Sequence, residues 1–408
     1  MTARGAQPGS LFFGWRVVGA GFVVAMFGWG FGFYGPPVFL HAVEAGRGWP
    51  LWLVSLAATC HFLAGAVVVA RMPALHARFG LVAVTRAGAV AAALGVLGWA
   101  LAAEPWQLFA ATLLSGAGWA GTGGAAINAI VAPWFARRRP AALGAAFNGA
   151  SMGGVLLVPL WVALIGALGF GWAAAVLGVA MLGAVWWVSA RYLGRSPAGM
   201  GLLPDGDAPG GAALARGRVA ARLGAQAWRD RRFVTLAGAN AICLFAQLGL
   251  IAHLISVLAP VLGAQGAGLA MGLATACAVA GRVLAGWLLR PGVDRRMAFA
   301  GNAAMQAASV LLLMTAGGQV GLVLLAVAIF GFGIGNATTL PPLIAQQDFA
   351  EPDMPRAVAL LVATGQATYA FAPAAFGLLR EIDTLTMFAA VAGFQALAAG
   401  LVLAGRRG

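Results

Sequence analysis

One arginine stands in the middle of a long apolar stretch. The run LATACAVAGRVLAGWLLRPG covers residues 273–292, and Arg282 is its only charged residue before the closing RPG. At the centre of a membrane-spanning helix, an arginine costs about 2.5–3.5 kcal/mol on insertion scales. A guanidinium does not escape that cost by losing its proton, and its planar fork pairs with carboxylates. The residue type therefore indicates a site for a carboxylate-bearing anion.

The counter-ion of Arg282 is the next question. The eleven acidic residues of the chain all fall in polar segments or at their edges, so no carboxylate lies inside an apolar run. The simplest interpretation is a water-filled cavity in which a bound anion supplies the missing charge. Small residues on the same helix face, Ala274, Ala278 and Gly281, suggest open space around the side chain. The alternative is that Arg282 extends to the headgroups near Arg290, about 12 Å away along a helix.

Several uncharged polar residues also lie within apolar runs. Gln366 and Tyr369 are three residues apart and share a helix face, which favours a common role in the cavity. Tyr34, just before a GPP sequence that can bend its helix, is a further candidate donor, as are Asn128 and Asn148. Each has an alternative role in a hydrogen bond between helices, and such bonds contribute about 0.6 kcal/mol on average. The same alternative applies to Asn240, Gln247 and Asn336.

His253 is the candidate for carrying a proton. With no carboxylate inside the apolar runs, histidine is the side chain that titrates near neutral pH. The alternative is a histidine bonded to a neighbouring helix, so proton coupling is allowed and not required. No metal-ligand spacing, phosphate-binding loop or nucleophile–base set stands out, and we expect neither an enzyme nor a cofactor.

The whole chain has the composition of a membrane protein. Of its 408 residues 62% are hydrophobic and 9% charged, with a mean hydropathy of +0.90. A soluble domain needs a more highly charged surface. Each span needs about 20 mainly apolar residues, and the sequence predicts an all-α membrane protein with twelve transmembrane helices. They cover residues 15–42, 50–72, 81–103, 106–134, 140–168, 172–193, 233–262, 267–289, 297–316, 319–346, 355–379 and 384–404.

Arginines predict the orientation of these spans. They cluster in alternate polar segments, such as ARRRP at 136–140, whereas the opposite segments hold mainly acidic residues. Arginine-rich loops mark the cytoplasmic side, which places both termini in the cytoplasm. This topology also accounts for the net charge of +14 without a nucleic-acid partner. One long polar stretch predicts a linker at 194–232 between two six-helix halves, 1–193 and 233–408.

Several stretches carry a family resemblance. FGWRVVGAGFVVAMFGWGFGFYGPPV, PWFARRRPAALG, GLLPDGD and AGRVLAGWL are similar to the first span, the basic loop, the linker and the eighth span of one transporter branch. That branch comprises the monocarboxylate transporters and oxalate–formate antiporters of the major facilitator superfamily. The chain departs from the pattern at Ala77, Arg290 and Ala278, where acids are common, and it has no lysine in the eleventh span.

The resemblance implies two pseudo-symmetric six-helix halves with a site between them and transport by alternating access. The expected substrate is a small organic anion, a monocarboxylate first among them, with a coupling proton as an optional partner. We expect a monomer in the lipid bilayer of a bacterial inner membrane. Efflux of drugs or other hydrophobic compounds is the alternative, because 14 Trp and 23 Phe would allow an aromatic cavity. A sensor that does not transport is a rival from another class, although no soluble domain is apparent.

Overall fold

The computed structural model describes residues 12–206, 225–288, 293–349 and 353–406, and in this part of the chain the regular structure is helical with no strand. The first part holds α1 (Phe13–Gly32), α2 (Gly35–Arg47), α3 (Leu51–Phe79), α4 (Leu81–Leu101), α5 (Pro105–Thr122), α6 (Gly124–Val131), α7 (Arg139–Met152), α8 (Val158–Leu168) and α9 (Phe170–Val188). The second part holds α10 (Arg231–Leu288), α11 (Arg295–Thr315), α12 (Val320–Asp348), α13 (Met354–Tyr369), α14 (Ala372–Ile382) and α15 (Thr384–Ala404).

The described helices are consistent with the twelve predicted spans. Ten helical segments are long and apolar enough to cross a membrane. One of them, α10, has 58 residues, about 87 Å of helix against a hydrocarbon core of about 30 Å. The chain breaks at Gly263, where φ is 70° and ψ is 164°, a conformation that favours glycine. It therefore supplies two crossings, and the break between them lies at the predicted gap at 263–266. The helices α5 and α6, broken only at Gly123, supply a further crossing.

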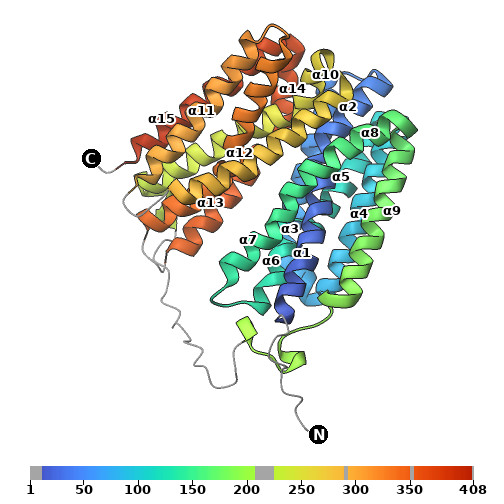
Figure 1. Cartoon of the computed structure of the whole chain (residues 1–408), viewed down its shortest axis with the longest axis vertical. Coiled ribbons are helices and arrows are strands. Elements are labelled where there is room, and N and C mark those ends of the chain that lie inside the picture. Colours follow the sequence, from blue (N-terminus) through green and yellow to red (C-terminus); the bar gives the residue numbers. More distant parts are fainter. Residues whose placement is uncertain (1–11, 207–224, 289–292, 350–352, 407–408) are drawn as a thin grey trace.

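The helices form two groups in chain order (Figure 1). The N-terminal helix group comprises α1–α9, drawn blue to green, and the C-terminal helix group comprises α10–α15, drawn yellow to red. The groups pack together through α2, α3 and α8 on one side and α10 and α14 on the other. At the opposite end α7 and α13 diverge (Figure 1). The borders at 193/194 and 232/233 stay a prediction, and 207–224 and Arg290 lie outside the described residues.

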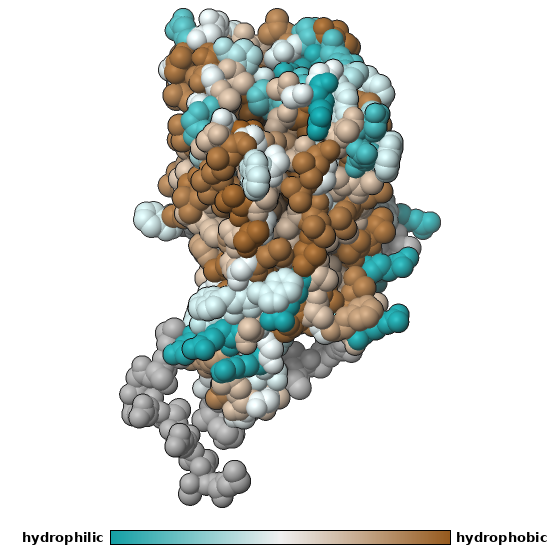
Figure 2. All heavy atoms as spheres, turned by 90° about the vertical axis from the view of Figure 1, so that its right-hand side faces the viewer, coloured by the Kyte–Doolittle hydropathy of each residue, from teal (hydrophilic) through white to brown (hydrophobic). Residues whose placement is uncertain are grey.

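The packed end is closed by polar contacts between the groups. The Trp52 backbone N–H donates to the Glu381 carboxylate at 3.0 Å, and the Ala374 N–H donates to Thr59 Oγ1 at 3.0 Å. Large apolar side chains are exposed on the outer surface of the helices, and Val179, for example, is 70% exposed. Figure 2 shows apolar residues dominating a middle band of one face, with hydrophilic residues towards its ends. Such a band is the surface that a bilayer covers.

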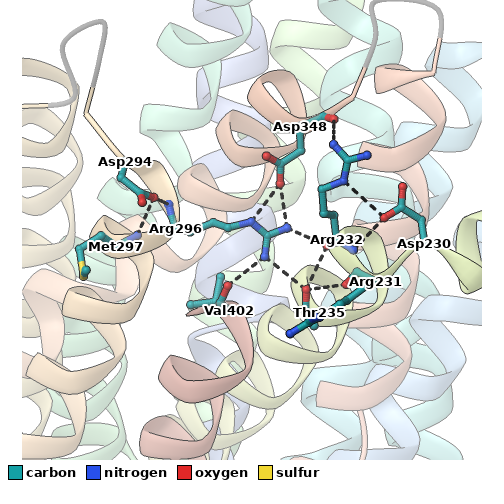
Figure 3. A network of polar contacts seen from close by, with 9 residues as sticks. All are labelled: Asp230, Arg231, Arg232, Thr235, Asp294, Arg296, Met297, Asp348 and Val402. Carbon is teal, nitrogen blue, oxygen red and sulfur yellow. Dashed lines mark hydrogen bonds and ion pairs between the residues drawn. The ribbon is translucent and has the colours of Figure 1, made fainter. Parts of the chain in front are cut away.

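Four helices of the C-terminal helix group are joined by a buried arginine (Figure 3). The Arg296 side chain, 5% exposed at the start of α11, forms an ion pair with Asp348 of α12 at 2.7 Å. Its guanidinium also donates to the carbonyls of Arg232 in α10 and Val402 in α15, at 2.7 and 2.9 Å. Beside it, Asp294 caps α11 and pairs with Arg406. An arginine that sequence patterning assigns to topology is therefore a structural residue.

An aspartate holds the loop between α7 and the preceding helices. The Asp205 carboxylate accepts hydrogen bonds from the backbone N–H groups of Ala136, Arg137 and Arg138 at 2.8–3.2 Å. Partial burial opposes ionisation, but these three donors and the Arg137 charge outweigh it and hold the pKa of Asp205 below its usual value. The PDG turn after α9 is thereby attached to the arginine-rich loop.

Candidate substrate site between the two helix groups

Arg282 lies where the two helix groups meet. It follows Gly263 by nineteen residues, about 29 Å of helix, and its side chain is half-buried. Its guanidinium donates to the hydroxyl of Ser151 in α7, and the phenol of Tyr34 lies nearby. Both belong to the N-terminal helix group. Among the residues that the structure describes, no carboxylate lies within ion-pair distance of Arg282.

The small residues beside Arg282 serve helix packing. A Cβ added at Gly281 would lie 2.0 Å from the Phe332 carbonyl of α12, and one added at Gly331 would lie 2.4 Å from the Ala274 carbonyl. Gly335 lets the aliphatic stem of Arg282 cross α12, because a Cβ there would come within 2.6 Å of Arg282 Cγ. The expectation of open space beside these small residues is therefore wrong on the side that faces α12, because α12 fills it. The guanidinium is thus directed towards the N-terminal helix group.

Tyr369 and Gln366 reach the same boundary from α13. The two side chains are neighbours on one face of the helix, as the three-residue spacing predicts. The Tyr369 ring packs edge-on against Phe62 and Phe33 of the N-terminal helix group, with centroids 5.9 and 6.5 Å apart. Phe33 in turn contacts Tyr34 at 5.0 Å. A continuous row of aromatic rings therefore runs from Tyr369 through Phe33 to Tyr34, near Arg282.

The two candidate asparagines lie on exposed surfaces of the N-terminal helix group. Asn128 donates to the Gly124 carbonyl of its own helix at 2.9 Å. Asn148 precedes Ser151 by three residues on α7, so the two share a face. Asn148 is therefore one helical turn from the hydroxyl that binds Arg282.

His253 lies at a different level of the molecule. It precedes Gly263 by ten residues, about 15 Å, against about 29 Å for Arg282. The side chain is fully buried, and Nε2 donates to the Pro373 carbonyl of α14 at 3.0 Å, because a carbonyl only accepts. Gly377 and Ser55 pack beside it, and the half-buried Arg380 is close. His253 therefore belongs to the contact that closes the packed end.

Two other buried amides join neighbouring helices, which is the alternative role predicted for them. Asn240 of α10 donates to the Leu361 carbonyl of α13 at 3.1 Å. Asn336 of α12 donates to Asn302 of α11 at 3.2 Å. For both residues, interhelical hydrogen bonding is confirmed.

Sequence reasoning missed three residues near these sites. Ser151 and Thr275 are small polar residues of a kind that is common in membrane helices. The one signal in the sequence is that Ser151 follows the candidate Asn148 by three residues and so shares its helix face. Arg380 resembles a loop arginine, yet it is half-buried and donates to the hydroxyl and carbonyl of Ser256. Glu44 of the N-terminal helix group is close enough to interact with its charge.

The fold and the site define a multi-pass helical transporter with its polar centre between two helix groups, not an enzyme. A family model described as the Major Facilitator Superfamily matches residues 17–373, and the chain belongs to that family. Monocarboxylate transporter 11 of Homo sapiens is 30% identical over 301 residues, which cover 72% of this chain and 59% of that protein. The chain therefore spans less than two thirds of that relative's length.

Solved transporters share the fold at low sequence identity. A mutant of the nucleoside transporter NupG superposes with a TM-score of 0.72 at 10% identity, covering 96% of this chain and 100% of that one. A bacterial homologue of the human lysosomal transporter Spinster, inward-facing and occupied, gives 0.69 at 14% identity, covering 97% of each chain. A POT family transporter in complex with 5-aminolevulinic acid gives 0.70 at 13% identity, covering 95% of each chain.

Proposed function

We propose that this transporter carries a small monocarboxylate, by alternating access of the two helix groups around Arg282. The observation that carries the proposal is a half-buried arginine at the boundary between the groups, with no carboxylate partner among the described residues. A bound carboxylate would supply the missing charge and accept the paired N–H groups of the guanidinium. The likeness to a monocarboxylate transporter supports the same substrate class.

The site suits one negative charge. In the described residues around Arg282, the neighbouring groups are hydroxyls and a phenol, and the aromatic row from Tyr369 supplies an apolar wall. A second carboxylate would be desolvated without a charged partner, which costs several kcal/mol. Gln366, Asn148 and Asn128 are proposed as secondary donors that line the path to the site.

The arrangement of the helices suggests which side is open. The groups are joined at the end where α3 meets α14, and they diverge at the end that carries the arginines at 137–139. If arginine-rich loops mark the cytoplasm, this conformation faces inwards. Both termini are then cytoplasmic, and we place a monomeric transporter in a bacterial inner membrane.

His253 is the proposed carrier of a coupling proton. It is shielded while α3 and α14 are in contact, since Gly377 of α14 lies close both to it and to Ser55 of α3. Opening of that contact is required for access from the other side and would expose the unpartnered Nδ1. Proton exchange at His253 would therefore be tied to one conformation, as coupled transport requires.

A ligand screen on the purified protein tests the substrate class. We expect thermal stabilisation by monocarboxylates from acetate to benzoate, and loss of that stabilisation in Arg282→Ala. Arg16→Ala, which removes an exposed arginine of α1, is the matched control and should respond like the wild type. Stabilisation by amphiphilic cations and not by any carboxylate would favour efflux of hydrophobic compounds and refute the proposal.

A further inference from the structure

Ser151 occupies an unusual point in its helix. It is 3% exposed and lies two residues before α7 changes into a π-helical turn, Gly153–Leu157. That turn packs tightly on α10, because a Cβ added at Gly154 would lie 2.6 Å from Thr275 Oγ1. Single π turns within α-helices are frequent at functional sites. The position of Ser151 opposite Arg282 is therefore supported by close packing of the Gly154 backbone against the Thr275 side chain of the other helix group.

The hydrogen-bonding capacity of Ser151 is only partly used. A serine hydroxyl has one donor and two acceptor positions, and Ser151 accepts from Arg282 Nη2. Within the described part of the chain, its own O–H donates to no protein group. The buried Ser115, Ser256 and Ser309 differ, because each donates to a carbonyl three residues earlier in its helix, whereas the buried Ser55 and Ser189 also lack an acceptor. The Ser151 proton is thus available to a ligand.

Arg282 also keeps most of its capacity. A guanidinium has five N–H donors, and one of them reaches Ser151. The others suffice for a bidentate carboxylate, which would then lie beside the Ser151 hydroxyl. We propose that Ser151 is a second ligand of the carboxylate bound by Arg282, donating its proton from the opposite helix group. This inference rests on the proposed function and adds a residue that determines affinity from the N-terminal side.

The consequence is that one anion connects both helix groups. Arg282 would bind it from α10 and Ser151 from α7, while their mutual hydrogen bond keeps the two donors together. A hydrogen bond to a charged acceptor is stronger than one between neutral groups. Loss of the Ser151 hydroxyl should therefore weaken carboxylate binding even though Arg282 retains its charge.

The test is equilibrium binding to the purified full-length protein, with the tightest monocarboxylate found between acetate and benzoate as the probe. Ser151→Ala should bind it about tenfold more weakly, a difference of about 1.4 kcal/mol. Ser151→Thr keeps a hydroxyl and should recover most of the affinity. The control is Ser309→Ala, which removes a hydroxyl that is 1% exposed and bonded within α11, and it should bind like the wild type.

Three results would decide the matter. Unchanged or tighter binding by Ser151→Ala would overturn the inference, because the serine would then only hold or compete for the arginine. If Ser151→Ala does not fold, Ser151→Cys, whose thiol is a weak donor, must show the same weakening. Arg282→Ala is measured in parallel. If it still binds, the proposed function fails, whereas loss of binding there with normal binding by Ser151→Ala refutes only the role of Ser151.

Discussion

Removal of the Asp348 carboxylate should destabilise the C-terminal helix group without touching the substrate site. Asp348 accepts from both Nε and Nη2 of Arg296, at 3.0 and 2.7 Å, and the two side chains are 14% and 5% exposed. Breaking such a buried pair leaves an uncompensated charge and costs about 3–5 kcal/mol. Two carbonyls and Thr235 still accept from Arg296. We therefore expect Asp348→Ala to lose about 3 kcal/mol, at the lower end of that range.

A nearby pair provides the comparison. Asp294 pairs with Arg406 at 2.7 Å, but these side chains are 40% and 42% exposed, so the pair itself contributes at most about 1 kcal/mol. Asp294 also caps α11, which adds about 1 kcal/mol. Thermal unfolding in detergent should show a clearly larger loss for Asp348→Ala than for Asp294→Ala. Equal melting temperatures for the two variants would refute the assignment of Arg296 as a buried structural residue.

Three further predictions concern substrate charge, proton coupling and acid stability. Lactate-sized monoanions should compete with a labelled monocarboxylate more strongly than oxalate, malonate or succinate at a pH where the diacids are fully ionised, because Arg282 is a single charge. Stronger inhibition by the dianions would reveal a second cation in the site. His253→Gln should remove the pH dependence of uptake and spare exchange at equilibrium, while an unchanged pH profile would exclude His253 as the proton carrier. The folded pKa of Asp205 lies below its value in the unfolded chain, so its stabilisation is present above that unfolded value and is lost as pH falls through the folded pKa. Limited proteolysis should therefore cut near residues 195–206 faster below about pH 4, and Asp205→Ala should show that behaviour already at neutral pH.

Hydropathy predicted the crossings well. The apolar runs correspond to the helices, and the predicted gap at 263–266 falls at the break in α10, since glycine alone tolerates that backbone conformation readily. The loop between α6 and α7 was also placed correctly, although the break at Gly123 left no mark in the hydropathy of the 106–134 run.

The polar residues were harder to interpret, because their roles depend on partners far away in the sequence. Arg282 was recognisable alone, as a charge in an apolar run. Ser151 is 131 residues from Arg282, and nothing in the composition around a serine shows which helix faces it. Arg296 was assigned to topology as one of the arginines in the polar segment between the spans 267–289 and 297–316. Only the packing of α10, α12 and α15 around it shows that it is buried. Helix-to-helix contacts of this kind are set by the assembled bundle.

Uptake of a labelled monocarboxylate by proteoliposomes containing the Arg282 variants tests the central claim most directly. Wild-type protein and Arg16→Ala should accumulate the label at the same rate. Arg282→Ala should show no uptake above protein-free vesicles while its melting temperature stays close to that of the wild type, because the removed charge has no carboxylate partner among the described residues. Arg282→Lys should retain part of the activity, since the charge remains and the planar fork is lost. Near wild-type uptake by folded Arg282→Ala would contradict the account.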